Sequence, residues 1–257
     1  MFQKKTNVII LAAGRGTRMK SSHPKVLHFL GGKTILEHVI QTAKSIKPKK
    51  IILVYNHPKK VISSIICNHS LELVMQKKPE GTGKAIQLAL KNIPNDENVL
   101  VLYGDVPFIS SKSIRKLQRL KKTSKINLLT MKVKNPNGYG RILRKKGRVV
   151  RIIEELDANY KERNIKEIYS GIFIANSEDL KKWLGKISNQ NKKKEYYATD
   201  IVAIAYFEGN FIQTTEPFKY QEILGVNNKL QLSMLENILQ QEQINKLLID
   251  GVMLKDP

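Results

Sequence analysis

The sequence predicts an α/β fold with a mostly parallel central sheet and a smaller additional β-sheet region. In the first half of the chain, short apolar runs rich in Val, Ile and Leu alternate with segments whose apolar residues recur at helical spacing. This alternation is typical of crossover units, in which helices cover both faces of a parallel sheet. The second half shows a hairpin pattern, and no low-complexity linker divides the chain. We therefore expect one domain over residues 1–257.

The first half supplies most of the expected parallel sheet. Each apolar run is short enough for a buried strand, and each intervening segment has the period of a helix. The expected strands are Asn7–Leu11, Lys50–Tyr55, Leu71–Met75 and Asn98–Tyr103, and the expected helices are Ile35–Ile46, Pro58–Cys67 and Thr82–Asn92.

The pattern changes after about residue 127. Arg141–Leu143 and Val149–Glu154 flank Lys145-Lys146-Gly147, a turn signal, and therefore predict a hairpin that starts the additional sheet. The remaining expected elements are strands at Ile168–Ala175 and Phe211–Thr215 and helices at Ser177–Leu184, Asp200–Phe207 and Lys229–Leu248, the last ending near Gly251.

The composition narrows the class of protein. The chain has 257 residues, a single cysteine and a formal net charge of +23 at pH 7. One cysteine excludes an internal disulfide framework and fits a reducing cytosol, so we expect a cytoplasmic protein. No segment approaches the ~20 continuous apolar residues of a membrane span. The positive charge suits phosphorylated substrates, but it also fits a solvated lysine surface. Its clusters lack interleaved aromatic residues, so no specific nucleic acid is expected.

The strongest local signal is the segment Leu11–Met19, which directly follows the first strand. Small residues and glycines at the carboxyl end of a strand let backbone N–H groups approach a phosphate closely. Open α/β sheets bind their ligands at this end. Arg18 and Lys25 add fixed positive charge, which suits a triphosphate whose charge must be neutralised during group transfer.

Two common phosphate-binding loops do not match this chain. A dinucleotide-binding loop would need a small residue where Met19 stands and an acid at the end of the second strand, where Tyr55 and Asn56 stand. A Walker loop fails at Gly83-Lys84-Ala85, because Ala85 replaces Ser or Thr and Lys78 replaces the first glycine. The glycine-rich segment therefore belongs to another kind of nucleotide site.

Two further signals lie at other strand ends and helix starts. Asp105, after the strand that ends at Tyr103, could either cap the next helix or bind a magnesium ion among phosphates. Gln76 precedes Gly81 and Thr82, which open the next helix. This second segment is either an ordinary flexible helix start or a set of donors for a base edge or phosphate.

With these segments in view, the chain resembles the N-terminal domain of bacterial N-acetylglucosamine-1-phosphate uridyltransferases. The resemblance covers essentially the whole chain. The glycine–arginine loop marks the wider sugar nucleotidyltransferase superfamily, whereas the segments around residues 138–142 and 195–200 are narrower. The matching segments are Leu11–Met19, Pro24–His28, Tyr103–Pro107, Gly138–Ile142, Glu154 with Asp157-Ala158, Glu195–Asp200, Gly225–Asn228 and Gly251-Val252 with Asp256-Pro257.

The resemblance implies a Rossmann-like sugar nucleotidyltransferase fold and a nucleotide site. The expected activity is transfer of UMP from UTP to N-acetylglucosamine 1-phosphate, for cell-envelope precursor synthesis. Arg18 and Lys25 would be catalytic and would grip the phosphates, and Gln76, Gly81 and Thr82 would read the uracil. The remaining nucleotide contacts would be Leu11, Ala12, Ala13, Gly14, Tyr103, Gly104 and Asp105.

The resemblance also implies a metal site and a sugar pocket. Asp105 and Asn227 would bind Mg²⁺ as the cofactor, and the partners would be UTP and a sugar 1-phosphate. The residues that would line the sugar pocket are Gly140, Glu154, Tyr169, Thr199 and Asn227.

The chain departs from the family pattern at three positions and in length. Tyr169 stands where the family usually has an asparagine that contacts the sugar, Lys84 replaces a histidine, and Glu80 replaces a leucine. Family members usually continue into a left-handed β-helix that acetylates glucosamine 1-phosphate and forms trimers. A chain that stops at Pro257 would lack that activity and the usual trimer contacts.

Three functions therefore remain open from sequence. The first is synthesis of UDP-N-acetylglucosamine. The second is the same chemistry on another sugar 1-phosphate, which Tyr169 makes conceivable. The third is a non-catalytic descendant that binds polyanions through its positive charge, although such a protein would have no need to keep Arg18, Lys25, Asp105 and Asn227 together.

Overall fold

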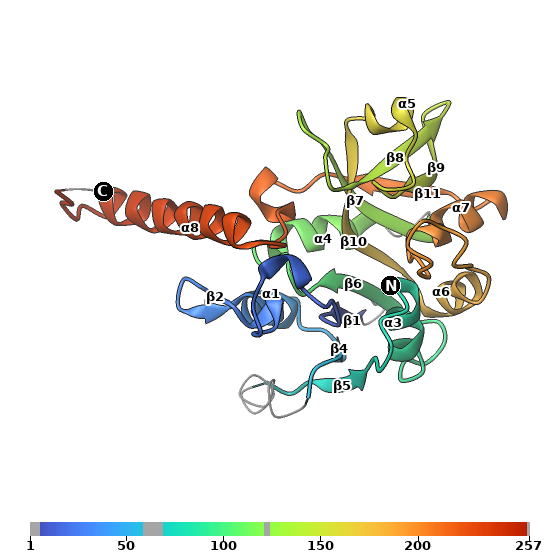
Figure 1. Ribbon diagram of the computed structural model, residues 1–257, viewed down its shortest axis with the longest axis horizontal. Coiled ribbons are helices and arrows are strands. Elements are labelled where there is room, and N and C mark those ends of the chain that lie inside the picture. The colour runs from blue at the N-terminus through green and yellow to red at the C-terminus, as the bar shows by residue number, and fades with distance from the viewer. Residues whose placement is uncertain (1–5, 59–68, 121–123, 256–257) are drawn as a thin grey trace.

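The computed structural model describes residues 6–58, 69–120 and 124–255. Its strands are β1 (Thr6–Leu11), β2 (Phe29–Leu30), β3 (Lys33–Thr34), β4 (Ile51–Tyr55), β5 (Glu72–Met75), β6 (Asn98–Tyr103), β7 (Ile126–Lys132), β8 (Gly140–Lys145), β9 (Arg148–Ile153), β10 (Glu167–Asn176) and β11 (Ile212–Thr215). Within these residues, a nine-stranded sheet has the order β11-β7-β10-β6-β1-β4-β5, and the β8–β9 hairpin joins it through β10 (Figure 1).

The central sheet is mostly parallel, as the sequence predicts. Strand β1 pairs in parallel with β4 and β6, and β4 pairs in parallel with β5. Strand β10 is the exception, because it runs antiparallel to both β6 and β7. The register between β10 and β7 shifts between Tyr169 and Phe173, where Gly171 has a φ of 91°. This irregularity lets one long strand join the main sheet and, near its start, pair with β8.

The helices cover both faces of the sheet. They are α1 (Ile35–Ser45), α3 (Thr82–Leu90), α4 (Ser111–Arg119), α5 (Tyr160–Arg163), α6 (Ser177–Leu184), α7 (Asp200–Phe207) and α8 (Lys229–Ile249), with short 3₁₀ turns η1 (Thr17–Met19), η2 (Lys25–Leu27) and η4 (Tyr220–Ile223).

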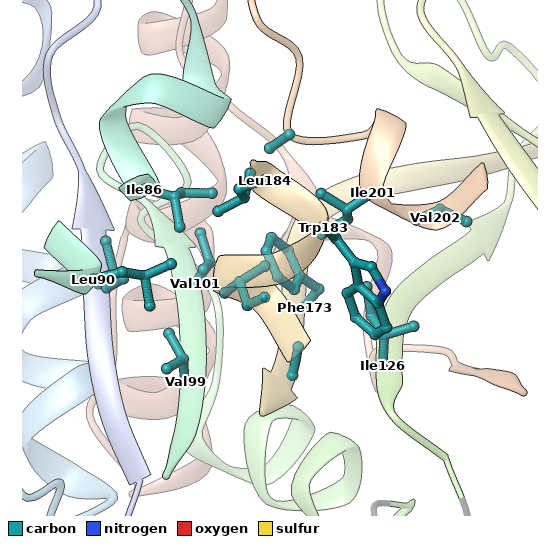
Figure 2. Packing of buried hydrophobic residues seen from close by; sticks show 14 of the residues in the cluster. Ile86, Leu90, Val99, Val101, Ile126, Phe173, Trp183, Leu184, Ile201 and Val202 are labelled. Carbon is teal, nitrogen blue, oxygen red and sulfur yellow. The ribbon is translucent and has the colours of Figure 1, made fainter. Parts of the chain in front are cut away.

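Alternation along the strands divides the core between the two faces. Ile9 of β1 packs in one cluster with residues of α3, α6 and α7, whereas its neighbours Val8 and Ile10 pack in the other with residues of α1 and α4. Successive side chains of a strand point to opposite faces, so a fully buried strand reads as a continuous apolar run. Figure 2 shows the first cluster, where Trp183 and Phe173 pack among aliphatic side chains.

Helix α8 extends away from the body of the protein (Figure 1). Its first half packs through Leu235 on a small third cluster that includes Met19, Leu30 and Val226. This contact ties the start of α8 to the β2–β3 hairpin and to the loop that follows β1. No helix among the described residues is both long enough and apolar enough to cross a membrane.

The expected elements in the described residues are confirmed with boundary shifts of one or two residues. The predicted helix Pro58–Cys67 falls mostly on residues 59–68, which lie outside the described residues. The sequence does not predict the short elements β2, β3, α5 and the 3₁₀ turns, nor two longer ones, β7 and α4. Strand β7 contains Asn127, at which the sequence pattern changes, and α4 has so many charges that its buried pair, Ile114 and Leu117, is hard to recognise.

Candidate active site

The carboxyl ends of β1, β5 and β6 form the floor of the candidate site. Leu11 and Tyr103 are register partners, and the Gly104 N–H donates to the Leu11 carbonyl at 2.9 Å. A cavity of about 150 Å³ opens above these strand ends. It is lined by Leu11, Ala12, Ala13, Gly14, Lys25, Val26, Gln76, Pro79, Gly81, Thr82, Ala85, Tyr103, Asp105 and Glu195.

The glycine-rich loop packs tightly on the segment that carries Lys25. Gly16 has a φ of 63°, and a Cβ there would lie only 2.7 Å from Cβ of Lys25. Only glycine tolerates both that conformation and that approach at little cost. The loop after β1 is therefore shaped so that Lys25 can lie beside it and reach the strand ends.

Four polar side chains meet at the edge of this cavity. Nζ of Lys25 forms an ion pair with Oδ2 of Asp105 and donates to Oδ1 of Asn227 at 3.2 Å. Nη2 of Arg18 donates to the same Asn227 oxygen at 2.8 Å. The structure therefore brings together all four residues that the sequence assigns to phosphate and metal binding. They come from the β1 loop, η2, the end of β6 and the segment before α8.

The alternative role of Asp105 as a helix cap is wrong. The next helix, α4, begins at Ser111, and its N-cap is Ser110, whose hydroxyl accepts from the Ser113 N–H at 3.1 Å. The Asp105 carboxylate faces Lys25 instead. Its backbone carbonyl accepts from the Val226 N–H at 2.9 Å, which fixes Asp105 beside Asn227.

The start of α3 is rigid and belongs to the cavity wall. Gly81 has a φ of 109°, and a Cβ there would lie 2.6 Å from the carbonyl oxygen of Tyr196. Nε2 of the buried Gln76 donates to the Gly81 carbonyl at 3.2 Å, and the Thr82 hydroxyl accepts from the Ala198 N–H at 3.0 Å. These contacts favour a fixed set of donors over an ordinary flexible helix start, and the role of the segment in nucleotide binding stays a prediction.

A larger cavity of about 850 Å³ adjoins the first and shares Lys25, Pro79 and Glu195 with it. Basic side chains from the β1 loop lie on its lining, and so do acidic side chains that follow β9. Four of the charged residues on this lining are not predicted as site residues from the sequence: Arg15, Glu155, Lys193 and Lys194. The complete lining is Arg15, Gly16, Thr17, Arg18, Lys25, Pro79, Glu80, Gly138, Glu154, Glu155, Leu156, Lys193, Lys194, Glu195, Tyr197 and Asn227.

Glu154 lies in an acidic part of the larger cavity. Its Oε1 accepts from the Thr199 hydroxyl at 2.9 Å, and a Cβ on Gly140 would lie 3.9 Å from its Oε2. Burial raises the pKa of Glu154, with a smaller contribution from nearby carboxylates, while the Thr199 hydrogen bond opposes the shift. Glu154, Thr199 and Gly140 are therefore neighbours, as the resemblance implies for a sugar pocket.

Asp200 provides a test of this acidic environment. Burial, and then Glu154 and Asp157, raise its pKa to about 6. The pKa of Asp200 in the unfolded chain lies near 3.9, so its ionisation disfavours folding. This penalty is full above about pH 6, shrinks as the pH falls from about 6 towards 3.9, and is absent below that range. We therefore expect Asp200→Asn to raise the free energy of unfolding more at pH 8 than at pH 5. Urea unfolding of the original chain and the variant at the two pH values measures this difference.

A matched control is Asp179→Asn, also in the first turn of a helix. Asp179 pairs with Lys125 at 2.9 Å, not with other acids, so its replacement should bring no gain at pH 8. Equal effects of Asp200→Asn at the two pH values would contradict the acidic environment described for Asp200.

Tyr169 has a different environment from the other expected sugar contacts. Its side chain is buried in the core cluster beside Tyr103, and its hydroxyl donates to the Gly171 carbonyl at 2.9 Å. It lines neither cavity. Lys84, another departure from the family pattern, places Nζ 4.4 Å from the centre of the Tyr196 ring. The role of Tyr169 in sugar binding remains a prediction.

The donor set of the candidate metal site contains two oxygens. Among the described residues, no group of three or more His, Cys, Asp or Glu side chains is placed to hold a metal ion. Asp105 and Asn227 nevertheless direct oxygens toward one cation, the ammonium of Lys25. Magnesium sites in phosphate-transfer proteins often use one or two carboxylates and leave the remaining positions to water and phosphates. The pair fits a divalent cation that binds together with a triphosphate.

The described strands form a Rossmann-like α/β sheet with a candidate phosphate site at the ends of β1, β5 and β6. The fold is similar to that of a UDP-glucose pyrophosphorylase bound to UDP-glucose, with a TM-score of 0.74 and 18% identity over 93% of this chain and 99% of that one. It is also similar to a nucleotidyl transferase from Methanothermobacter, with a TM-score of 0.66 and 15% identity over 93% and 99% of the two chains.

The chain belongs to the family of MobA-like NTP transferase domains, whose model matches residues 8–172. It is 66% identical over its whole length to the bifunctional protein GlmU of Buchnera aphidicola from Acyrthosiphon pisum (strain Tuc7), and 60% identical to that from Schizaphis graminum. In both cases it spans 56% of the relative's length. These identities confirm the resemblance that the sequence motifs indicate.

Proposed function

We propose that this chain transfers UMP from UTP to N-acetylglucosamine 1-phosphate and releases pyrophosphate. The observation that carries the proposal is the meeting of Arg18, Lys25, Asp105 and Asn227 at the junction of two adjoining cavities. One cavity has the strand-end geometry of a nucleotide site, and the other is large enough for a sugar phosphate. The name of the relatives, bifunctional protein GlmU, and the family model support the same reaction class.

The smaller cavity suits the nucleoside of UTP. The side-chain amide of Gln76 lies at the end of β5, and a glutamine amide both donates and accepts, so it can pair with the edge of a uracil. The close contact between Gly81 and Tyr196 leaves no room for a side chain at that position. The segment after β1 then offers backbone N–H groups to the phosphates.

The chemistry requires positioning and charge stabilisation more than a protein nucleophile. An oxygen of the sugar 1-phosphate attacks the α-phosphorus of UTP, a new P–O bond forms, and the bond to the bridging oxygen of the β-phosphate breaks. The nucleophile is already ionised, so no base is needed to activate it. Arg18 and Lys25 would hold the phosphates in line and offset the charge that develops on the leaving pyrophosphate.

We propose Mg²⁺ as the divalent cation of this site. Asp105 and Asn227 would hold it, because their oxygens converge on one point at the cavity edge. When bound, it would neutralise phosphate charge and strengthen the polarisation of the transferred group. Lys25 lies between the same two oxygens and keeps the site neutralised before substrate binds.

We assign the sugar 1-phosphate to the larger cavity, which Glu154 lines, with Gly140 and Thr199 beside Glu154 as further expected sugar contacts. We expect Tyr169→Asn to change acceptor choice: Tyr169 lines neither cavity, but removing its buried ring behind Glu154 would open space for the acetamido group there. The ratio of kcat/KM for N-acetylglucosamine 1-phosphate over glucose 1-phosphate should rise about tenfold. The measurement is pyrophosphate release with each acceptor in turn.

Tyr169→Phe is the matched control, because it keeps the ring and removes only the hydroxyl that donates to Gly171. It should leave the acceptor ratio within about twofold and cost about 1 kcal/mol of stability. An unchanged ratio in Tyr169→Asn would remove Tyr169 from the acceptor pocket. A ratio that falls would favour a pocket already adapted to the tyrosine, and with it another sugar 1-phosphate as the preferred acceptor.

The nucleotide assignment has its own test. Purified chain would be incubated with Mg²⁺, N-acetylglucosamine 1-phosphate and, separately, UTP, CTP, ATP or dTTP, with product followed by ³¹P NMR. UTP should give the highest kcat/KM, and CTP should be poor because cytosine presents a donor where uracil presents an acceptor. Equal use of UTP and CTP would contradict uracil recognition by Gln76 and the start of α3.

A further inference from the structure

Arg141 has a fully buried side chain next to the acceptor cavity, although it lines neither cavity itself. Its Nη1 donates to the Tyr139 carbonyl, and its Nε donates to the Arg163 carbonyl at 3.3 Å. Its Nη2 lies 2.7 Å from Oε2 of Glu155, an ion pair without the alignment of a hydrogen bond. The guanidinium therefore connects the segment before β8, the last residue of α5 and the residue that follows Glu154.

The same carboxylate oxygen extends this connection to the cavity lining. Oε2 of Glu155 also accepts from the Gly138 N–H at 3.1 Å, and both Gly138 and Glu155 line the larger cavity. Gly138 has a φ of 86°, is exposed, and a Cβ there would meet no atom within 4 Å, whereas Gly140 is held by its pairing with Tyr169 of β10. The hydrogen bond to Glu155 is therefore a main restraint on Gly138, the residue that leads into β8 on the cavity lining.

Packing alone does not account for a buried arginine, because its guanidinium loses hydration when it leaves water. A buried ion pair often gives no more stability than apolar side chains of similar volume, because both charges lose their hydration. A guanidinium does, however, offer donors in a fixed planar fork, which here hold two carbonyls in one relative orientation, while its charge attracts the Glu155 carboxylate. The geometry therefore favours an orienting role over a stabilising one.

We propose that Arg141, acting through Glu155, is a positioning residue that fixes Gly138 and the Tyr139 carbonyl on the wall of the larger cavity, and so sets the affinity for the sugar 1-phosphate. The substrate part of this inference rests on the proposed function. UTP binds on the other side of the junction, at the strand ends, and its affinity should not depend on this pair. A residue with a merely structural role would affect both substrates alike.

The kinetic test uses Arg141→Lys, Glu155→Gln and the double variant. Lysine keeps the charge without the planar fork, and glutamine keeps the shape without the charge. Each single variant should raise KM for N-acetylglucosamine 1-phosphate about tenfold, a coupling typical of residues in direct contact, and leave KM for UTP within about twofold. The double variant should be no worse than the poorer single one.

Arg144→Lys is the matched control, because Arg144 lies on the same strand and pairs with Glu167 at 2.6 Å away from both cavities. It should leave both KM values unchanged. A parallel rise in the two KM values, no rise in either, or additive effects in the double variant would overturn the proposal.

A second readout does not depend on turnover. Hydrogen exchange of the unliganded chain, followed by mass spectrometry, should be faster in Glu155→Gln for peptides that cover residues 136–141, and unchanged there in Arg144→Lys. Faster exchange in Glu155→Gln would support the Arg141–Glu155 connection even if the original chain turned over neither sugar phosphate. That lack of turnover would contradict the proposed function alone. Unchanged exchange would overturn the connection whatever the activity.

Discussion

Asp105→Asn is expected to lower kcat by roughly 10²–10³-fold, the size of effect seen when one preorganised electrostatic contact is lost from an active site. Asparagine has the shape of aspartate, so Lys25 keeps a neighbour, but the charge that would attract a divalent cation is lost. The apparent activation constant for Mg²⁺ should rise as well. Pyrophosphate release at saturating UTP and N-acetylglucosamine 1-phosphate, across a range of Mg²⁺ concentrations, measures both quantities.

The fold should survive this substitution. Asp105 keeps its backbone bond to Val226, and its side chain packs against Lys25 at the cavity edge and not in the core. Circular dichroism and thermal unfolding should therefore resemble those of the original chain. Asp250→Asn, at the exposed end of α8, is a control that should leave kcat unchanged. A kcat within threefold of the original in Asp105→Asn would remove Asp105 from the catalytic site.

Arg18→Ala is the substitution with the second largest expected effect, again roughly 10²–10³-fold in kcat. Arg18 is exposed, and its Nη2 donates to Asn227 at 2.8 Å, which directs the guanidinium across the junction of the two cavities. An arginine fork binds phosphate oxygens in pairs, so its loss should harm the transition state more than the bound substrates. Steady-state kinetics should show the loss mainly in kcat, with a smaller change in KM.

Because Arg18 is exposed, its removal should change the free energy of unfolding by no more than about 0.5 kcal/mol. The control is Arg148→Ala, which removes an equally exposed arginine from the start of β9. If the two variants lost activity equally, the effect would come from net charge and not from the position of Arg18. Retention of near-original activity in Arg18→Ala would exclude a catalytic role.

Much of the fold can be predicted from the sequence, because helices cover both faces of the sheet and strands buried on both faces are continuous apolar runs. Strands such as β6 are continuous apolar runs with clear ends, and their predicted bounds agree with the structure. The antiparallel direction of β10 does not follow, since periodicity reports burial and not direction. Strand β7 and helix α4 were missed for local reasons: Asn127 interrupts the apolar run, and most of the α4 surface is charged.

The candidate site follows from the sequence only in part. Motifs placed the loop after β1 and Asp105 at strand ends, and parallel topology then brings those ends together. The meeting of Lys25 with Asn227, 202 positions apart in the chain, was implied by the resemblance and not by local pattern. Arg141 lies within the matching segment Gly138–Ile142, but as a residue of an expected strand it has no role of its own in the predicted site. Lys193 gives no signal, because it belongs to a charge cluster that is typical of a solvated surface.

The most direct test of the proposed reaction is pyrophosphate release by the purified chain with Mg²⁺ and UTP. N-acetylglucosamine 1-phosphate and glucose 1-phosphate would be offered in parallel, with folding checked by circular dichroism. Release with N-acetylglucosamine 1-phosphate, at a kcat/KM at least about tenfold above that for glucose 1-phosphate, is the expected result. Release with glucose 1-phosphate alone would contradict the acceptor, and no release with either from folded protein would contradict the assignment of UMP transfer itself.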